Sequence, residues 1–121
     1  MILAILLVAA VPSLPGCVPG QKPTVRPAKI TIACADANFY VDRMRWSSWK
    51  TNAAAGAGTA HVNDCTPYCA AGHFHTYAVT IALSQTTRCQ GRTVFSRLRW
   101  RFTRAKPKDQ PRAGSITYGC L

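Results

Sequence analysis

Hydrophobic and polar residues alternate along much of this chain, and the alternation is clearest between Val94 and Phe102. Because successive side chains of a β-strand point to opposite faces, a period of two predicts a strand with one buried face. The predicted inner face carries Val94, Leu98, Trp100 and Phe102. The opposite face carries Arg97, Arg99 and Arg101. We therefore expect the apolar side to lie against a core and the arginines to point into solvent.

Other segments show the same period less strongly. Residues 73–83 place four apolar side chains on one face: Tyr77, Val79, Ile81 and Leu83. Residues 29–34, 44–49 and 115–118 are also predicted strands, and the small, glycine-spaced residues 53–60 suit a closely packed strand or a loop. No window shows the 3.6-residue period of an amphipathic helix. The sequence therefore predicts an all-β domain, with two sheets packed face to face as in a β-sandwich.

An unbroken apolar run extends from Ile2 to Val11. As a helix, ten residues span about 15 Å, which is half the hydrocarbon core of a bilayer. A signal-peptide core therefore fits this run better than a membrane anchor does. After removal of such a leader, about 105 residues remain, which suits one domain. The predicted parts are a signal peptide (1–16), a proline-rich tether (17–28), a disulfide-bonded β domain (29–104) and a C-terminal extension (105–121).

Four of the six cysteines lie inside the predicted β domain: Cys34, Cys65, Cys69 and Cys89. Downstream of an export leader they predict disulfides, because disulfides persist in oxidising compartments. Four cysteines allow three pairings. We favour long-range pairs over a Cys65–Cys69 bond, because closing a short loop restricts the unfolded chain less. The predicted location is extracytoplasmic, either secreted or associated with the cell envelope.

Cys17 follows the tripeptide Leu14-Pro15-Gly16, and the four residues together resemble a bacterial lipobox. In a lipobox the cysteine becomes the lipidated first residue, which would tether this protein to a membrane and leave Cys120 unpaired. Ordinary cleavage nearby is the alternative. In that case Cys17 stays a thiol or a disulfide partner, and a Cys17–Cys120 bond would tie the two ends of the chain together.

The charge of the chain is strongly unbalanced, with 15 Lys and Arg against four Asp and no Glu, and the net charge is +11. Such a charge attracts anionic partners, and the attraction weakens as salt rises. The side chains of Arg97, Arg99 and Arg101 emerge about 6.6 Å apart and form planar forks suited to carboxylates or phosphates. Arg43 and Arg45 extend this surface if their strand shares its face. We expect an anionic cell-envelope polymer as partner and no sequence-specific nucleic acid, since no nucleic-acid-binding motif occurs.

The three histidines are the only candidates for acid–base or metal chemistry. His73 and His75 lie close to Cys65 and Cys69, but this spacing differs from common zinc patterns, and oxidised cysteines cannot bind zinc. His61, His73 and His75 could supply the acid and base of a small nuclease, although nothing in the sequence brings them to one cleft. We therefore predict no metal, no cofactor and no catalytic residue, and an enzyme is the less favoured interpretation.

Three motifs carry a resemblance to a known group of proteins. They are Ala33-Cys34-Ala35-Asp36-Ala37-Asn38, Met44-x-Trp46-Ser47-Ser48-Trp49 and Asn63-Asp64-Cys65-Thr66-Pro67-x-Cys69. Together they resemble small exported actinobacterial proteins without an assigned function, over about residues 28 to 104. The resemblance implies an exported, cysteine-bonded β domain and transfers no catalytic residue. The Asp and Asn residues of these motifs are predicted to form turns through their side chains.

These observations favour an exported or envelope-associated protein that binds or supports other molecules and is not an enzyme. A basic face would contact its anionic partner. Two alternatives stay open. One is a small secreted nuclease or hydrolase that depends on histidine, and the other is a cationic effector that acts on membranes. The residues leave the oligomeric state and the identity of the partner open.

Overall fold

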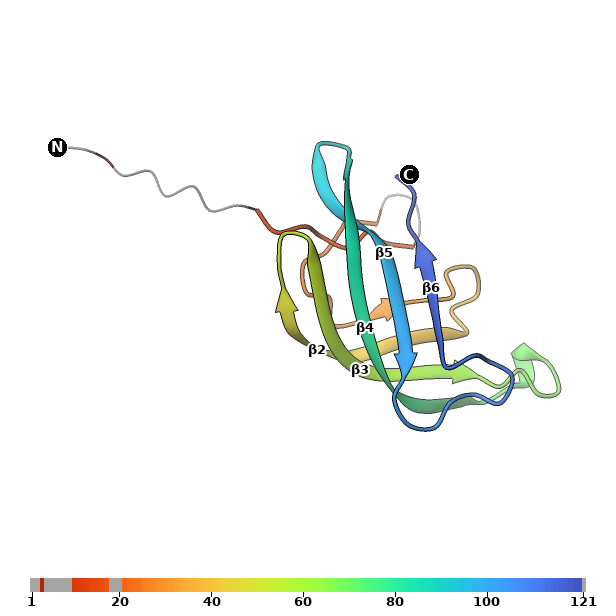
Figure 1. Ribbon diagram of the computed structural model, residues 1–121. Coiled ribbons are helices and arrows are strands. Elements are labelled where there is room, and N and C mark those ends of the chain that lie inside the picture. Colours follow the sequence, from red (N-terminus) through yellow and green to blue (C-terminus); the bar gives the residue numbers. More distant parts are fainter. Residues whose placement is uncertain (1–2, 4–9, 18–20, 121) are drawn as a thin grey trace.

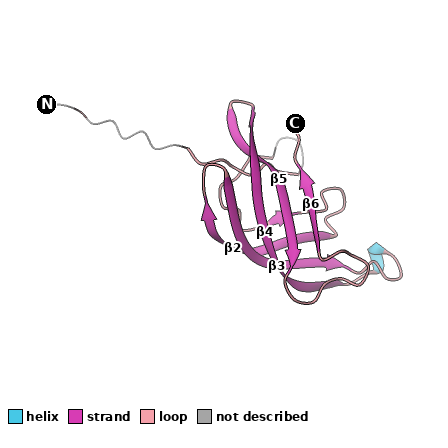
Figure 2. Ribbon diagram, viewed as in Figure 1, coloured by secondary structure: helices cyan, strands magenta, loops and turns pink. Residues whose placement is uncertain are grey.

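The computed structural model describes Leu3, residues 10–17 and residues 21–120. Within these residues the chain forms one antiparallel sheet of six strands in sequence order, shown in Figures 1 and 2. The strands are β1 (Ile30–Thr31), β2 (Phe39–Trp49), β3 (Ala53–Asn63), β4 (Phe74–Cys89), β5 (Arg92–Phe102) and β6 (Ala113–Thr117). A single 3₁₀ turn, η1 (Cys69–Ala71), lies between β3 and β4. The prediction of an all-β, disulfide-stabilised domain is confirmed.

The core lies inside the curl of this one sheet. Alternate residues of β4 and β5 are buried, as their period predicts: Val79, Ile81, Leu83, Leu98 and Phe102. Aromatic rings of β2 meet rings of β5, although two strands separate these strands in the sheet. The ring of Phe39 stacks on Phe102 at 5.8 Å, and Trp49 meets Phe95 edge-on at 5.5 Å. The sheet therefore closes on its own inner face, and this curl replaces the two separate sheets of a sandwich.

Two backbone features shape the long strands. In β2, Arg43 has a φ of 52° and lies where the register with β3 shifts, between Asp42 and Arg45. Such a bulge places an extra residue on one strand and increases its twist. The β4–β5 hairpin turns through Gln90 and Gly91, which both have positive φ, as a two-residue hairpin turn requires. Together these features let long antiparallel strands bend around a small core.

The disulfides join different partners from those expected. The pairs are Cys17–Cys34, Cys65–Cys69 and Cys89–Cys120. The preference for long-range pairs among the four inner cysteines is therefore wrong, because loop entropy describes the unfolded chain and not which sulfurs the fold brings together. Cys65 and Cys69 lie on either side of one tight loop, whereas Cys34 and Cys89 each bond a cysteine near a chain end.

Cys17 is a disulfide partner and not a lipid attachment site in this structure. Its sulfur is bonded to Cys34, so it has no free valence for a thioether to a lipid. The expected Cys17–Cys120 bond is also absent, because Cys120 is bonded to Cys89 at the β4–β5 hairpin. All six cysteines are described, and none is free.

The folded part extends beyond the predicted range 29–104 at both ends. Residues 11–17, here called the N-terminal strap, run along the sheet, and Pro12, Ser13 and Leu14 are buried. Pro27, in the segment predicted as a tether, is buried, and its carbonyl accepts a hydrogen bond from the indole of Trp46 at 2.9 Å. The predicted C-terminal extension contributes β6 to the sheet. Of the predicted leader, residues 1–2 and 4–9 lie outside the described part of the chain.

Candidate functional site

The outer face of the sheet carries arginines around a floor of small side chains. Register pairs connect Arg101 of β5 to Thr80, Thr80 to Ala57, and Ala57 to Arg45 of β2. This row crosses four strands. Because positions i and i+2 of a strand share a face, Arg99 stands in the neighbouring row on the same side. The fold therefore brings Arg45 onto the same face as Arg99 and Arg101, although β2 and β5 are not adjacent.

A hollow of about 600 Å³ lies over this part of the face. Its lining includes Arg45, Arg99 and Arg101 at the sides and Ala55, Ala57 and Ala82 on the floor. Long side chains at the edges and methyl groups between them produce the depression. The small residues 53–60 predict a closely packed strand or a loop, and the sequence alone gives them no binding role. Their alternation with glycine, beside strands that carry arginine, was the available signal for such a floor.

The arginines of this hollow have no acidic partner. Both ion pairs found among the described residues join an aspartate to a histidine, Asp42 to His61 at 2.8 Å and Asp64 to His75 at 2.9 Å. No carboxylate lines the hollow. Uncompensated positive charges close together repel one another, so an anion bound between them is favoured. The hollow is therefore a preformed site of positive potential.

Two of the five arginines predicted to bind anions lie outside this hollow. Arg43 occupies the bulge of β2 and does not line the depression, although its side chain is exposed. Arg97 is half-buried, pairs in register with Ser84 and Thr117, and its Nε is buried without a hydrogen-bond partner. The structure thus groups Arg45, Arg99 and Arg101 and separates the other two from them.

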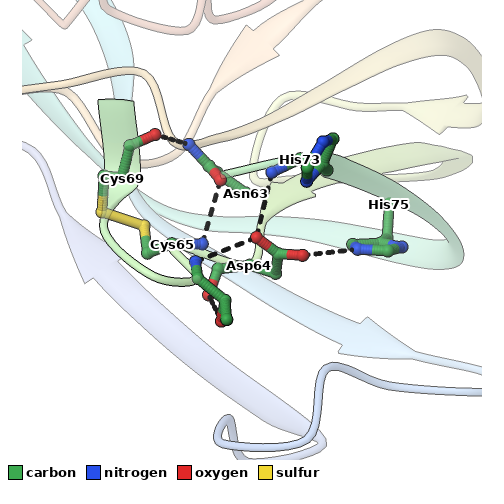
Figure 3. A network of polar contacts seen from close by, with 7 residues as sticks. Asn63, Asp64, Cys65, Cys69, His73 and His75 are labelled. Carbon is green, nitrogen blue, oxygen red and sulfur yellow. Dashed lines mark hydrogen bonds and ion pairs between the residues drawn. A yellow bond between two sulfur atoms is a disulfide. The ribbon is translucent and has the colours of Figure 1, made fainter. Parts of the chain in front are cut away.

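A second polar cluster surrounds Asp64 in the loop after β3 (Figure 3). One oxygen of its carboxylate accepts hydrogen bonds from the backbone N–H groups of His73 at 2.9 Å and Thr66 at 3.1 Å. The other oxygen lies 2.9 Å from Nε2 of His75. These donors, the His73 amide first, hold the pKa of Asp64 well below its usual range. Asp64 therefore stays ionised and fixes the path of its loop.

The side chain of Asn63 also holds this loop in place, through three hydrogen bonds. Its side-chain NH₂ donates to the side-chain oxygen of Asn38 at 3.0 Å and to the carbonyl of Cys69 at 2.8 Å. Its side-chain oxygen accepts from the N–H of Cys65 at 3.0 Å. Together with the Cys65–Cys69 bond, these contacts tie the loop to the sheet. The predicted turn role is confirmed for Asp36, Asn63 and Asp64, whose side chains each accept a hydrogen bond from the backbone N–H two residues later. It is not found for Asn38, whose side-chain oxygen accepts from the side chain of Asn63.

The histidines do not meet in a common cleft. His61 pairs in register with Thr76, the residue that follows His75, so the side chains of His61 and His75 point to opposite faces of the sheet. The ring of His61 stacks on Tyr40 at 4.5 Å. His73 joins the Asp64 cluster through its backbone N–H. The fold therefore separates His61 from His75 across the sheet.

The positions of the histidines do not assemble the zinc site that was considered for His73 and His75. Among the described residues, no group of three His, Cys, Asp or Glu side chains lies close enough to hold a metal ion. Cys65 and Cys69 are bonded to each other, so neither can act as a thiolate ligand. A separate hollow of about 640 Å³ has Asp64, His75, Tyr77, Lys108 and Asp109 among its lining residues.

Comparison with protein-family models, with curated proteins and with solved structures finds no match for this chain. The resemblance to small exported proteins therefore stays a prediction. In the part of the chain that the structure describes, no helix has both the length and the apolar character needed to cross a bilayer. The geometry and the charge of the described side chains are therefore what indicates a function for this chain.

Proposed function

We propose that this chain is an exported, envelope-associated binding protein without catalytic activity, and that its outer sheet face holds an anionic polymer. One observation carries the proposal: Arg45, Arg99 and Arg101 surround a hollow that contains no carboxylate. Three disulfides are compatible with an oxidising location outside the cytoplasm. Localisation at the envelope would place the positive face next to the acidic polymers found there.

The spacing of the arginines favours a polymer over a single small anion. Arg99 and Arg101 are two residues apart on β5, so they are separated by about 6.6 Å along the strand. Arg45 lies three strand spacings from Arg101, or about 14 Å along the row. A polymer with repeated anionic groups can contact all three guanidinium groups while the arginine side chains stay apart, whereas a single phosphate or carboxylate requires them to converge on one point.

The floor of the hollow favours an extended, aliphatic chain. Ala55, Ala57 and Ala82 present methyl groups, and a flexible polymer backbone can lie flat across them. Nucleobases usually stack on aromatic side chains in proteins that bind single strands. Trp100 also lines the hollow, but its ring packs edge-on against Phe39 of the core at 5.6 Å, and arginines and small residues supply most of the remaining lining. The proposal therefore names a repeating phosphate or carboxylate polymer as ligand and not a nucleic acid.

Binding of polyphosphate and of polyglutamate to the full chain tests the proposal, with neutral dextran as the uncharged control. Fluorescence anisotropy of the labelled polymers should show binding at low salt that weakens as ionic strength rises. Replacing both Arg99 and Arg101 by Ala should weaken binding about tenfold, equivalent to about 1.4 kcal/mol. No binding of either polymer at low salt would refute the proposed function.

A matched variant separates the site from the overall charge. Arg92 is the first residue of β5 and Arg104 lies two residues after its end; both are exposed and neither lines the hollow. The double change of Arg92 and Arg104 to Ala removes the same charge and should weaken binding by about twofold or less. Equal losses in both double variants would show that net charge alone attracts the polymer. Cleavage of RNA that is lost in His75→Ala, or leakage of anionic vesicles, would instead favour the alternative functions.

A further inference from the structure

The N-terminal strap is bonded to the sheet on both of its sides. The N–H of Ser13 donates to the carbonyl of Thr93 at 3.2 Å, and its carbonyl accepts from the N–H of Phe95 at 2.9 Å. Leu14 and Thr24 exchange two backbone hydrogen bonds at 2.9 and 3.0 Å. The strap thus lies between β5 and the segment around Thr24, and it satisfies backbone groups on each of them.

The strap also fills part of the core. The side chains of Pro12 and Leu14 are buried, and Leu14 belongs to the main hydrophobic cluster with an exposed fraction of 4%. The carbonyl of Pro12 accepts a buried hydrogen bond from the indole N–H of Trp49 at 2.7 Å. Loss of residues up to Gly16 would leave this indole N–H without its partner and would expose the apolar surface beneath Leu14, which is unfavourable on both counts.

Cys17 closes the strap covalently. Its bond to Cys34 attaches the end of the strap to the turn between β1 and β2. A cysteine lipidated at a mature N-terminus carries its lipid on the same sulfur, so the disulfide and the lipid exclude each other. Processing immediately before Cys17 would also remove Pro12, Ser13 and Leu14 from the fold.

We infer that the export leader is removed at a peptide bond on the N-terminal side of Pro12, so that the mature protein keeps the strap. The Ala10–Val11 bond is the best candidate, because Ala10 is a small residue close to the end of the apolar run and lies upstream of Pro12. A peptidase of the export pathway hydrolyses this bond. The hydroxyl group of water goes to the carbonyl carbon of Ala10, and a hydrogen goes to the new amino group of Val11.

This inference rests on the export in the proposed function, and mass analysis of exported full chain tests it. Protein from the medium and from the membrane fraction is sequenced from its N-terminus and weighed intact, with and without reductant. We expect a mature chain that begins upstream of Pro12, carries no acyl group, and gains two hydrogen masses per disulfide on reduction. A first residue between Ser13 and Cys17, with or without lipid, would overturn the inference while leaving export intact. Cytoplasmic protein that keeps Met1 would refute export itself.

Two variants keep the inference testable by other measurements. Cys17→Ser should be processed at the same bond as the wild type, because the inferred cut does not need the cysteine. Accumulation of unprocessed Cys17→Ser precursor would contradict the inference, since lipid-dependent processing requires that sulfur. Leu14→Ala should lower the melting temperature by several degrees, whereas Val25→Ala, at a side chain with an exposed fraction of 38%, should leave it nearly unchanged. Equal melting temperatures in these two variants would show that the strap does not belong to the mature core.

Discussion

Removal of the Cys89–Cys120 disulfide should destabilise the fold more than removal of the Cys65–Cys69 disulfide. The first bond joins the β4–β5 hairpin to the chain beyond β6, across a sequence separation of 31 residues. The second closes a separation of four residues within one loop. The proposed perturbations are the paired changes Cys89→Ser with Cys120→Ser, and Cys65→Ser with Cys69→Ser. They remove the same atoms and differ mainly in loop length.

The loop lengths set the expected difference in the free energy of unfolding. A cross-link removes chain entropy from the unfolded state, and the effect grows with the logarithm of the loop length. For the Cys89–Cys120 bond it corresponds to about 3.7 kcal/mol, and for the Cys65–Cys69 bond to about 1.9 kcal/mol. The Cys17–Cys34 bond, with a separation of 17 residues, lies between them at about 3.1 kcal/mol.

Urea unfolding followed by tryptophan fluorescence measures these differences, since the chain contains three tryptophans. Linear extrapolation to water gives the free energy of unfolding for each variant. We expect the Cys89–Cys120 variant to lose about 2 kcal/mol more than the Cys65–Cys69 variant. A larger loss for the Cys65–Cys69 variant would refute the reasoning. It would show that the short bond acts on the native loop around Asn63 and Asp64 and not on the unfolded chain.

Two further predictions concern the core and the Asp64 cluster. Leu98 has an exposed fraction of 0%, so Leu98→Ala should lower the free energy of unfolding by about 3 kcal/mol in the same urea assay. The control Val25→Ala should lower it by less than about 0.5 kcal/mol, and similar losses in both variants would contradict the burial of Leu98. The pKa of Asp64 is depressed in the fold, so its contribution to stability is present above the ordinary carboxyl pKa of about 3.9 and is lost as the pH falls further. Melting temperatures should therefore fall more steeply below about pH 4 in the wild type than in Asp64→Asn, and parallel curves would contradict this role.

The strands at the centre of the sheet were predictable because their alternation is uninterrupted. The predicted strand from Val94 to Phe102 lies within β5, and the predicted 73–83 lies mostly within β4. In β2 only 44–49 was predicted. Phe39 and Val41 are buried and alternate with less buried residues. The bulge at Arg43 shifts this alternation by one residue, so the later part of the strand follows a different pattern. A period-two search stops at such a shift, so the first half of the strand was missed.

The candidate site was predictable only in part, because it depends on contacts between distant strands. Alternation placed Arg99 and Arg101 on one face of their strand. It could not place Arg45 beside them, since that position follows from the register of β2, β3, β4 and β5 together. The predicted disulfide pairs were wrong for a related reason. Cys17 pairs with Cys34 only because the strap returns along the sheet, and no local pattern describes that path.

The disulfides near the two ends of the described chain have a consequence for digestion by exopeptidases. Cys17 and Cys120 each bond a cysteine of the central fold, so the chain cannot be pulled away from the sheet at these two points without breaking a covalent bond. Exopeptidases need several residues of slack to thread a substrate into their active sites. Digestion from either terminus should therefore halt a few residues from these crosslinks.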